Sequence, residues 1–246
     1  PAGVALSVGG FLVLASGGYA LGVSGACVKA VVGSVFAFPD RLTRATPLIC
    51  TGLAAALAFR AKLWNIGGDG QLYLGAMAAV AIGTGAIDIP GIFLVPLIVA
   101  MGAAAGAAGM MAPTYLRVKF GADEVVTTLL LNFIILILVQ MMLEGSLQDP
   151  MGLGWPQSAP ILDQGMLPKL LDRMRLHSGL ILALVLAVVA QFMLARFVWG
   201  FKLRAVGENV AAARHAGINV NRSFFALAAI SRAFGGPAGV EVVAWA

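Results

Sequence analysis

The sequence predicts an all-α membrane protein: a polytopic bundle of transmembrane helices in a single domain, residues 1–246. Hydrophobic residues make up 60% of the chain and charged residues 11%, whereas soluble domains have roughly 45–50% and about 25%. Long apolar runs alternate with polar loops, and most runs approach the roughly 20 residues that cross a bilayer as a helix. Gly and Ala are frequent within these runs, which lets membrane helices approach closely.

The apolar segments predict seven crossings in chain order. The first is longer than the apolar region of a signal peptide and no Lys or Arg precedes it, so we expect a retained helix. A further piece, residues 25–38 with Lys29, is expected to be re-entrant, interfacial or an eighth span, of about ten in a complete subunit. Because the chain lacks an initial Met and ends on an apolar run, we expect it to be part of a longer protein. The expected spans are residues 2–23, 48–63, 72–89, 92–112, 125–143, 180–198 and 223–246.

Lys and Arg predict the orientation. If residues 199–222 are cytoplasmic, alternation places 60–71 and 113–124 on the same side, and these regions with Arg196 hold nine Lys/Arg. The opposite loops are longer in sum and hold six. The positive-inside rule therefore predicts that the amino end of this multi-pass protein lies inside. The predicted outer loops are residues 24–47, 88–91 and 144–179.

A basic, Ala-rich island, residues 199–222, separates the last two apolar runs. A short helix is expected to open at Glu208 and Asn209, whose polar groups suit exposed amides, and to end at Gly217. About two turns of helix with small side chains suit a groove on another protein. The alternative is an interfacial helix on anionic head groups, but the run lacks the large apolar face of such anchors.

Two polar groups are candidates for a solute path. Residues 65–71 have three Gly in four positions, which favours a non-helical turn lining a cavity or, alternatively, a plain cytoplasmic turn. In the second group, Asp123 and Glu124 suit a helix amino end, while Thr and Asn side chains either bond within the bundle or face a polar path. The candidate path residues are Asn65, Gly67, Gly68, Gly70, Gln71, Thr127, Thr128 and Asn132.

Small residues recur at four-residue spacing in two of the spans. Gly102 and Gly106 form a GxxxG pair, and Gly75, Ala79 and Gly83 repeat the spacing, which favours close helix packing. The alternative is the general abundance of Gly and Ala in membrane helices.

No catalytic, nucleotide-binding or metal-binding motif occurs, so no enzyme activity, cofactor or metal is predicted. Cys27 and Cys50 lie in apolar surroundings that suit packing, and His177 and His215 have no evident partner. The net charge of +5 comes from loops rather than from one basic stripe, so nucleic acid is not an expected partner. Transport would need an ion gradient or a separate motor.

Three blocks resemble a known family: TPLICTGLAAALAFRAKLWNIGGDGQLYLGA, GADEVVTTLLLNFI and GFKLRAVGENVAAARHAGINV, followed by SRAFGGPAGVEV. They look like the permease subunit of bacterial ABC transporters, in the simple sugar and nucleoside importer branch of the branched-chain amino acid/ribose-type superfamily. The resemblance implies a lipid-embedded pair of permeases, homo- or heterodimeric, two cytoplasmic ABC ATPase subunits and an extracytoplasmic solute-binding protein in the inner membrane. It assigns ATPase coupling to Arg204, Gly207, Glu208, Asn209, Ala212, Ala213, Gly217 and Ile218.

The chain departs from the family pattern at two places. Gly68 and Asp69 stand where relatives commonly have Ala-Glu, and Arg232 stands where a small residue is usual; Glu241 is its possible partner only if the helix bends. The alternatives are a permease for branched-chain amino acids or an ion-coupled secondary transporter. The latter requires intramembrane carboxylates, and the spans have almost none before Glu241. An intramembrane enzyme requires a larger acidic cluster than Asp123 with Glu124.

Overall fold

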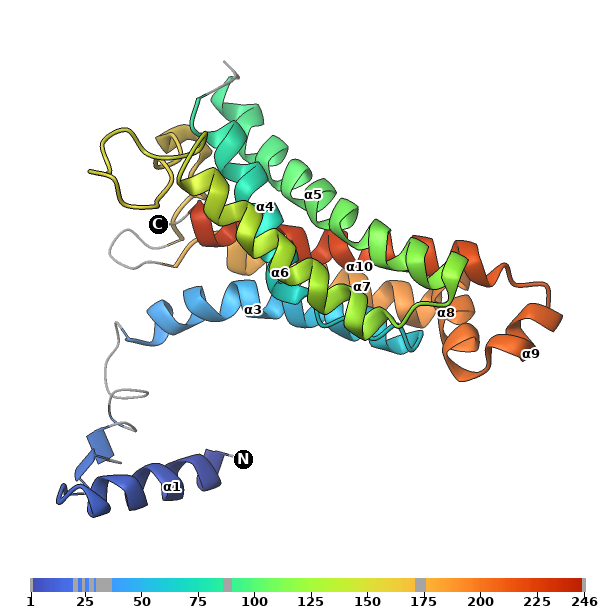
Figure 1. Ribbon diagram of the computed structural model, residues 1–246, viewed down its shortest axis with the longest axis horizontal. Coiled ribbons are helices and arrows are strands. Elements are labelled where there is room, and N and C mark those ends of the chain that lie inside the picture. The colour runs from blue at the N-terminus through green and yellow to red at the C-terminus, as the bar shows by residue number, and fades with distance from the viewer. Residues whose placement is uncertain are drawn as a thin grey trace.

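A computed structural model describes residues 2–19, 22–23, 25–26, 29, 37–85, 90–170 and 176–244. Within these residues the predicted all-helical polytopic bundle is confirmed, and β structure is limited to isolated bridges. Figure 1 shows the helices running mostly lengthwise, with α1 lying apart from the others. The helices are α1 (Ala2–Ala15), α3 (Ala37–Arg60), α4 (Gly68–Gly83), α5 (Gly91–Phe120), α6 (Glu124–Leu143), α7 (Gly179–Arg196), α8 (Val198–Glu208), α9 (Val210–His215) and α10 (Val220–Val243), with a 3-10 turn η1 (Asp163–Gly165).

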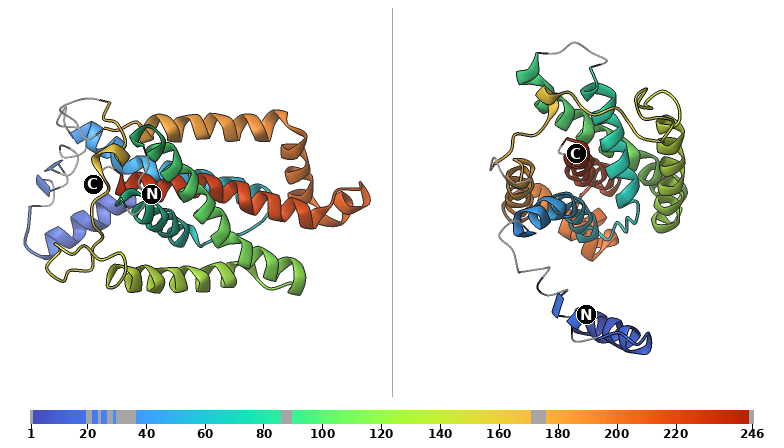
Figure 2. Two further views of the ribbon diagram at one scale, coloured as in Figure 1. Left: turned by 90° about the horizontal axis from the view of Figure 1, so that it is seen from above. Right: turned by 90° about the vertical axis from the view of Figure 1, so that its left-hand side faces the viewer.

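Four of the described helices are long and apolar enough to cross a membrane: Phe38–Arg60, Gly91–Phe120, Glu124–Leu143 and Gly179–Arg196. The other expected spans correspond to α1, α4 and α10. α1 has 14 residues and ends before Gly17, whose φ of +80° turns the chain. α4 is short and α10 carries charged side chains, but both pack lengthwise inside the bundle (Figure 2). The expected piece 25–38 lies largely outside the described residues, as does Cys27.

The second span begins earlier than expected, because α3 starts at Ala37 and continues through Pro47. Proline removes an amide donor, and threonine hydroxyls reinforce the turns before it. Thr43 Oγ1 donates to Pro39 O at 3.0 Å and Thr46 Oγ1 to Leu42 O at 2.8 Å. The predicted loop over residues 24–47 is therefore wrong for its last eleven residues, which form helix.

The boundaries of the third and fourth spans also differ from the prediction. α4 begins at Gly68 rather than at residue 72, because Asn132 on α6 accepts a hydrogen bond from Gly70 N and satisfies an amide of its first turn. Gly costs about 1 kcal/mol against Ala inside a helix, and this tertiary contact offsets part of it. α5 continues through Pro113 to Phe120, where Gly121 (φ +66°) closes the helix. Its 30 residues span about 45 Å, so it extends beyond the hydrocarbon.

α10 is the central helix, packed against α3, α4 and α5 (Figure 2). Its approach to α4 and α5 is so close that a Cβ on Gly75 or Gly236 would overlap backbone atoms of the facing helix. A Cβ on Gly106 would lie 2.9 Å from Arg232 O and from Gly236 Cα. The predicted close packing is confirmed for Gly75, Gly102 and Gly106, since these glycines meet α10 directly. It is not confirmed for Gly83, where a Cβ would meet the side chain of Ile161 outside the helices.

The loops sort to two ends of the bundle as alternation predicts. Arg117 Nη1 donates to Lys62 O at 3.3 Å and pairs with Glu124, and its guanidinium lies 4.7 Å from the Phe224 ring centroid. These contacts join the α3–α4 loop, the α5–α6 loop and the start of α10 at the end where α8 and α9 lie (Figure 1). The described part of residues 144–178, with η1, lies at the other end.

Candidate functional site

The Ala-rich island folds into two helices rather than one. α8 ends with Glu208, and Asn209 follows in extended conformation (φ −152°, ψ 108°). Asn209 Oδ1 then accepts from Ala211 N at 2.9 Å and Ala212 N at 3.0 Å, which caps α9. Gly217, at φ +78°, ends the turn after α9. The expected start at Asn209 and stop at Gly217 are confirmed, whereas Glu208 belongs to the preceding helix.

α8 is fixed to the bundle by its apolar face. Leu203 and Val206 are each 1% exposed and pack with Leu57, Ala58 and other residues of α3. A Cβ on Gly207 would overlap Arg60 O at the end of α3, so Gly is required for this approach. α8 is therefore anchored on α3, and it also contacts α7 and α10.

The residues assigned to ATPase coupling divide into two sets by exposure. Gly207 and Ala213 are buried against the bundle, and Ile218 is half-buried. Ala213 N and Ile218 N are held by backbone bonds to Asn209 O and Ala213 O. Five others are exposed at this end of the bundle, and we call them together the α9 surface: Arg204, Glu208, Asn209, Ala212 and Gly217.

The candidate path residues come together where the α3–α4 loop meets α6. Gly67 N donates to Asn65 Oδ1 at 3.0 Å, and Ile66 N donates to Thr128 Oγ1 at 3.3 Å. Asn132 is the acceptor for Gly70 N. The predicted tie between two helices through Asn132 is what the geometry shows. The expected non-helical turn over residues 65–71 ends at Gly67, because residues 68–71 already belong to α4.

The threonines also bond within α6, as the structural alternative predicts. Thr127 Oγ1 donates to Asp123 O at 3.0 Å and Thr128 Oγ1 to Glu124 O at 2.6 Å. Asp123 caps α6 by accepting from Val125 N at 2.7 Å. Glu124 was expected only to complement the dipole at the amino end of α6. Its side chain also accepts a hydrogen bond from Trp64 N at 3.3 Å.

Gln71 connects this cluster to the centre of the bundle. Its Oε1 accepts from Arg232 Nη1 on α10, and the side chains of Asn65, Gln71, Thr128 and Arg232 are all at least nine-tenths buried. We call these four residues, with Asn132, the polar cluster. Arg232 therefore has a partner on α4, and Glu241 is not its ion-pair partner among the described residues.

Glu241 and His177 lie toward the opposite end of the bundle. Cys50 Sγ lies 3.9 Å from Glu241 Oε1, close enough for a weak thiol hydrogen bond. His177, expected to be a loop residue without a partner, is 2% exposed, and its Nδ1 accepts from Gly179 N at 3.1 Å at the start of α7. Burial lowers the pKa of His177 below its usual value. His215 lies on α9, with Nδ1 2.9 Å from Ala211 O.

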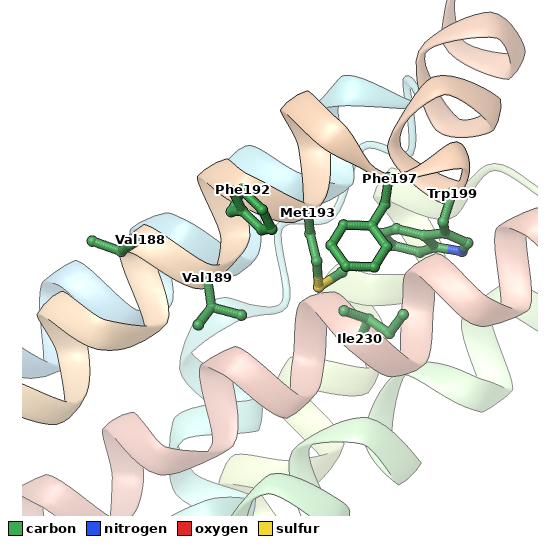
Figure 3. A pocket seen from close by; sticks show the side chains of 7 residues that line it. All are labelled: Val188, Val189, Phe192, Met193, Phe197, Trp199 and Ile230. Carbon is green, nitrogen blue, oxygen red and sulfur yellow. The ribbon is translucent and has the colours of Figure 1, made fainter.

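A separate apolar cavity of about 560 Å³ lies between α7 and α10, beside the turn into α8. Figure 3 shows Met193 and Phe197 pointing toward Ile230 across it. A solute rich in hydroxyl groups does not suit this lining, because its polar groups would be buried without hydrogen-bond partners. All of the lining side chains are apolar or aromatic: Val188, Val189, Phe192, Met193, Phe197, Trp199 and Ile230.

Sequence reasoning missed the Gln71–Arg232 contact and the role of α10 as the central packing helix. The first joins residues 161 positions apart, so no local pattern indicates it. The second had a visible signal, because Gly235, Gly236 and Gly239 form a small-residue run like those noted on α4 and α5. Among the described residues no three His, Cys, Asp or Glu side chains group to hold a metal ion.

Comparison with known proteins gives a consistent family. The chain is 35% identical over 235 residues to a guanosine ABC transporter permease protein of Bacillus subtilis, covering 95% of this chain and 67% of that protein. It is 32% identical over 250 residues to a glucose ABC transporter permease protein of Haloferax volcanii, covering 98% and 65%. It is 30% identical over 216 residues to a nucleoside ABC transporter permease protein of Lactococcus lactis, covering 85% and 59%.

The chain thus spans about two thirds of the length of these relatives. No solved structure matches. The model of the family described as branched-chain amino acid transport system / permease component matches residues 39–245. This range includes the polar cluster and the α9 surface, and with the agreement of the relatives it shows that the chain belongs to this family of ABC transporter permeases.

Proposed function

We propose that the chain is the membrane-spanning subunit of an ABC importer and forms the translocation path for a simple sugar or a nucleoside. The names of its relatives, which include guanosine, glucose and nucleoside permeases, support this class of solute. The all-helical bundle and its four helices of membrane-spanning length support a multi-pass location. We place it in the bacterial inner membrane.

In this proposal the chain acts within a larger assembly. A second permease subunit completes the path, a solute-binding protein delivers solute on the outer side, and ABC ATPase subunits bind on the cytoplasmic side. ATP hydrolysis takes place on those ATPase subunits. Coupling then requires a permease surface that contacts the ATPase and two bundle packings close in free energy, one of which ATP binding favours.

The α9 surface is the observation that carries the proposal. It lies at the same end as the two other loops that the positive-inside rule assigns to the cytoplasm (Figure 1). Ala211 and Ala212 are exposed between a capped helix start and Gly217, with Arg214 beside them. Small side chains let a groove on the ATPase approach the helix closely, and the flanking charges fix its register.

The polar cluster supports a path next to α10. Its amide, hydroxyl and guanidinium groups extend from α6 and the α3–α4 loop, through Gln71 on α4, to Arg232 on α10. Buried polar groups in a membrane bundle typically mark substrate pathways. A change in the packing of α10 would therefore reach both the α9 surface and the polar cluster.

The test uses the full-length subunit, reconstituted with its ATPase and its solute-binding protein in proteoliposomes. Ala212→Trp adds bulk on the exposed face of α9, so we expect ATPase association and ATP-driven uptake to fall at least about ten-fold while insertion and folding persist. Ala213 is unsuitable because it is 3% exposed and a bulky residue there would disturb the bundle itself.

Leu153→Trp provides the matched control, since Leu153 is 95% exposed at the opposite end. It should leave ATPase association unchanged. Wild-type uptake in the absence of any ATPase subunit, or normal coupling in Ala212→Trp, would contradict the proposal.

A further inference from the structure

The guanidinium of Arg232 has unused hydrogen-bonding capacity. Arg232 is 1% exposed in the middle of α10, and Nη1 donates to Gln71 Oε1. Its other two nitrogens, Nε and Nη2, are buried and have no hydrogen-bond partner among the described residues. A charged donor left unsatisfied in a membrane bundle is costly. We therefore expect these two nitrogens to have a partner during the working cycle of the protein.

The two unused nitrogens form one recognition edge. In a planar guanidinium the N–H of Nε and one N–H of Nη2 point the same way, side by side, while Nη1 lies on the other edge. Such a fork pairs with two acceptors that lie side by side in one plane. The partner that binds Nε and Nη2 therefore presents two neighbouring acceptor atoms to Arg232.

A third unused donor lies in the same cluster. Asn65 is 5% exposed, and its Nδ2 also has no hydrogen-bond partner among the described residues. A Cβ on Gly67 would lie 3.3 Å from Asn65 Oδ1 and 3.4 Å from Gln71 Nε2, so both amides lie against the same turn of the chain. Because the three unused atoms, Nε and Nη2 of Arg232 and Nδ2 of Asn65, are all donors, the group that binds them is rich in acceptors.

An α-amino acid fits this arrangement poorly. Its carboxylate would suit the fork, but its ammonium group, one carbon away, needs a nearby acidic partner. Glu241 is nine residues further along α10, about 13.5 Å along the axis and half a turn around it. It lies against Cys50 instead. The polar cluster has no carboxylate of its own to hold an ammonium group.

We infer that Arg232 recognises the O6 and N7 acceptors of a 6-oxopurine nucleoside in the solute path. This inference rests on the proposed importer function and narrows its substrate class. Arg pairs bidentately with O6 and N7 of guanine, and this pairing discriminates against a purine whose 6-position carries an amino donor. Adenosine would place that donor against the guanidinium. A sugar lacks a planar edge with two acceptors.

The test measures nucleoside binding to the full-length permease in complex with its ATPase, without the solute-binding protein, so that the specificity of that protein does not contribute. Dissociation constants are compared for guanosine, 7-deazaguanosine, which lacks the N7 acceptor, and adenosine. We expect guanosine to bind roughly ten-fold or more tightly than either analogue. Leucine serves as the carboxylate competitor and should not displace guanosine.

Arg232→Lys keeps the positive charge but removes the fork. It should bind guanosine and 7-deazaguanosine equally, as should Arg232→Gln. Arg222→Lys, an exposed position at the start of the same helix, is the control and should keep the preference. If a variant at Arg232 fails to fold, equal affinity of the wild type for guanosine and 7-deazaguanosine would still overturn the inference.

Equal wild-type affinity for the three nucleosides would overturn the inference. So would displacement by leucine, or a preference that survives in Arg232→Lys. Uptake assays separate this result from the proposed function. If nucleoside uptake is driven by ATP but guanosine is not preferred over its analogues, only the role of Arg232 is refuted. If guanosine is preferred but uptake does not need an ATPase, the importer assignment is refuted.

Discussion

Replacing Gly236 by Ala is expected to separate α10 from α5. A Cβ at this position would lie 2.6 Å from the carbonyl carbon of Gly102 and 2.8 Å from Ala103 Cα. Both atoms belong to the backbone of the facing helix and cannot rotate away as a side-chain end could. Overpacking a tight core typically costs 1–3 kcal/mol, and contact with backbone places this case in the upper half of that range. We therefore expect a loss of about 2 kcal/mol in the free energy of unfolding.

The adjacent Gly235 provides a matched control. A Cβ there would lie 3.4 Å from Ala54 Cβ and 3.9 Å from Gln71 Oε1, both ordinary contacts. Ala is favoured over Gly inside a helix by up to about 1 kcal/mol, so Gly235→Ala should be neutral or stabilising. The two variants should differ by about 3 kcal/mol in total, from about 2 lost and about 1 gained.

The assay is reversible unfolding of the full-length subunit in detergent micelles, with tryptophan fluorescence as the readout. The wild-type permease is the reference. Two variants whose free energies of unfolding agree within about 0.5 kcal/mol would refute the packing argument. That result would mean that α5 and α10 separate at little cost, and the close approach at Gly236 would no longer fix α10 in the bundle.

Two further changes test the ends of the bundle. Burial lowers the pKa of His177 in the folded protein below its value of about 6.5 in the unfolded chain. The neutral side chain therefore contributes its full stabilisation above pH 6.5, and this stabilisation is lost as the pH falls through the folded-state pKa. The melting temperature should drop below pH 6.5 in the wild type, and less so in His177→Gln; an unchanged pH profile would contradict this. Asn132→Leu leaves Gly70 N without its acceptor and should cost about 1 kcal/mol in the same unfolding assay, whereas Asn132→Asp, which keeps an acceptor, should cost less.

Features encoded by neighbouring residues were predictable from the sequence. Asn209 and Gly217 mark the limits of α9 because a capping side chain and a left-handed turn are local requirements. The same holds for Asp123, which caps α6 two residues away through Val125 N. Composition and the length of the apolar runs were enough for the fold class.

Features that depend on distant contacts were not predictable from one sequence. The glycines of residues 67–70 favour a turn locally, yet α4 starts at Gly68 because Asn132, 62 positions from Gly70, supplies an acceptor. α3 continues through Pro47 because it packs along α10 and its threonines bond to carbonyls of the preceding turn. In each case tertiary contacts outweigh a local preference of about 1–3 kcal/mol.

In the proposed importer, α10 is the element that joins the two candidate sites. The segment between α9 and α10 is short and is held by hydrogen bonds from Gly217 N to Arg214 O at 3.1 Å and from Ile218 N to Ala213 O at 3.0 Å. α10 then runs for 24 residues, about 36 Å of continuous helix, past Arg232 to Glu241. Glycines on α10 lie against backbone atoms of α4 and α5, so side-chain movement at these contacts can absorb little of a displacement at α9. We therefore expect such a displacement to shift α10, and with it the hydrogen bond between Arg232 and Gln71 at the edge of the polar cluster.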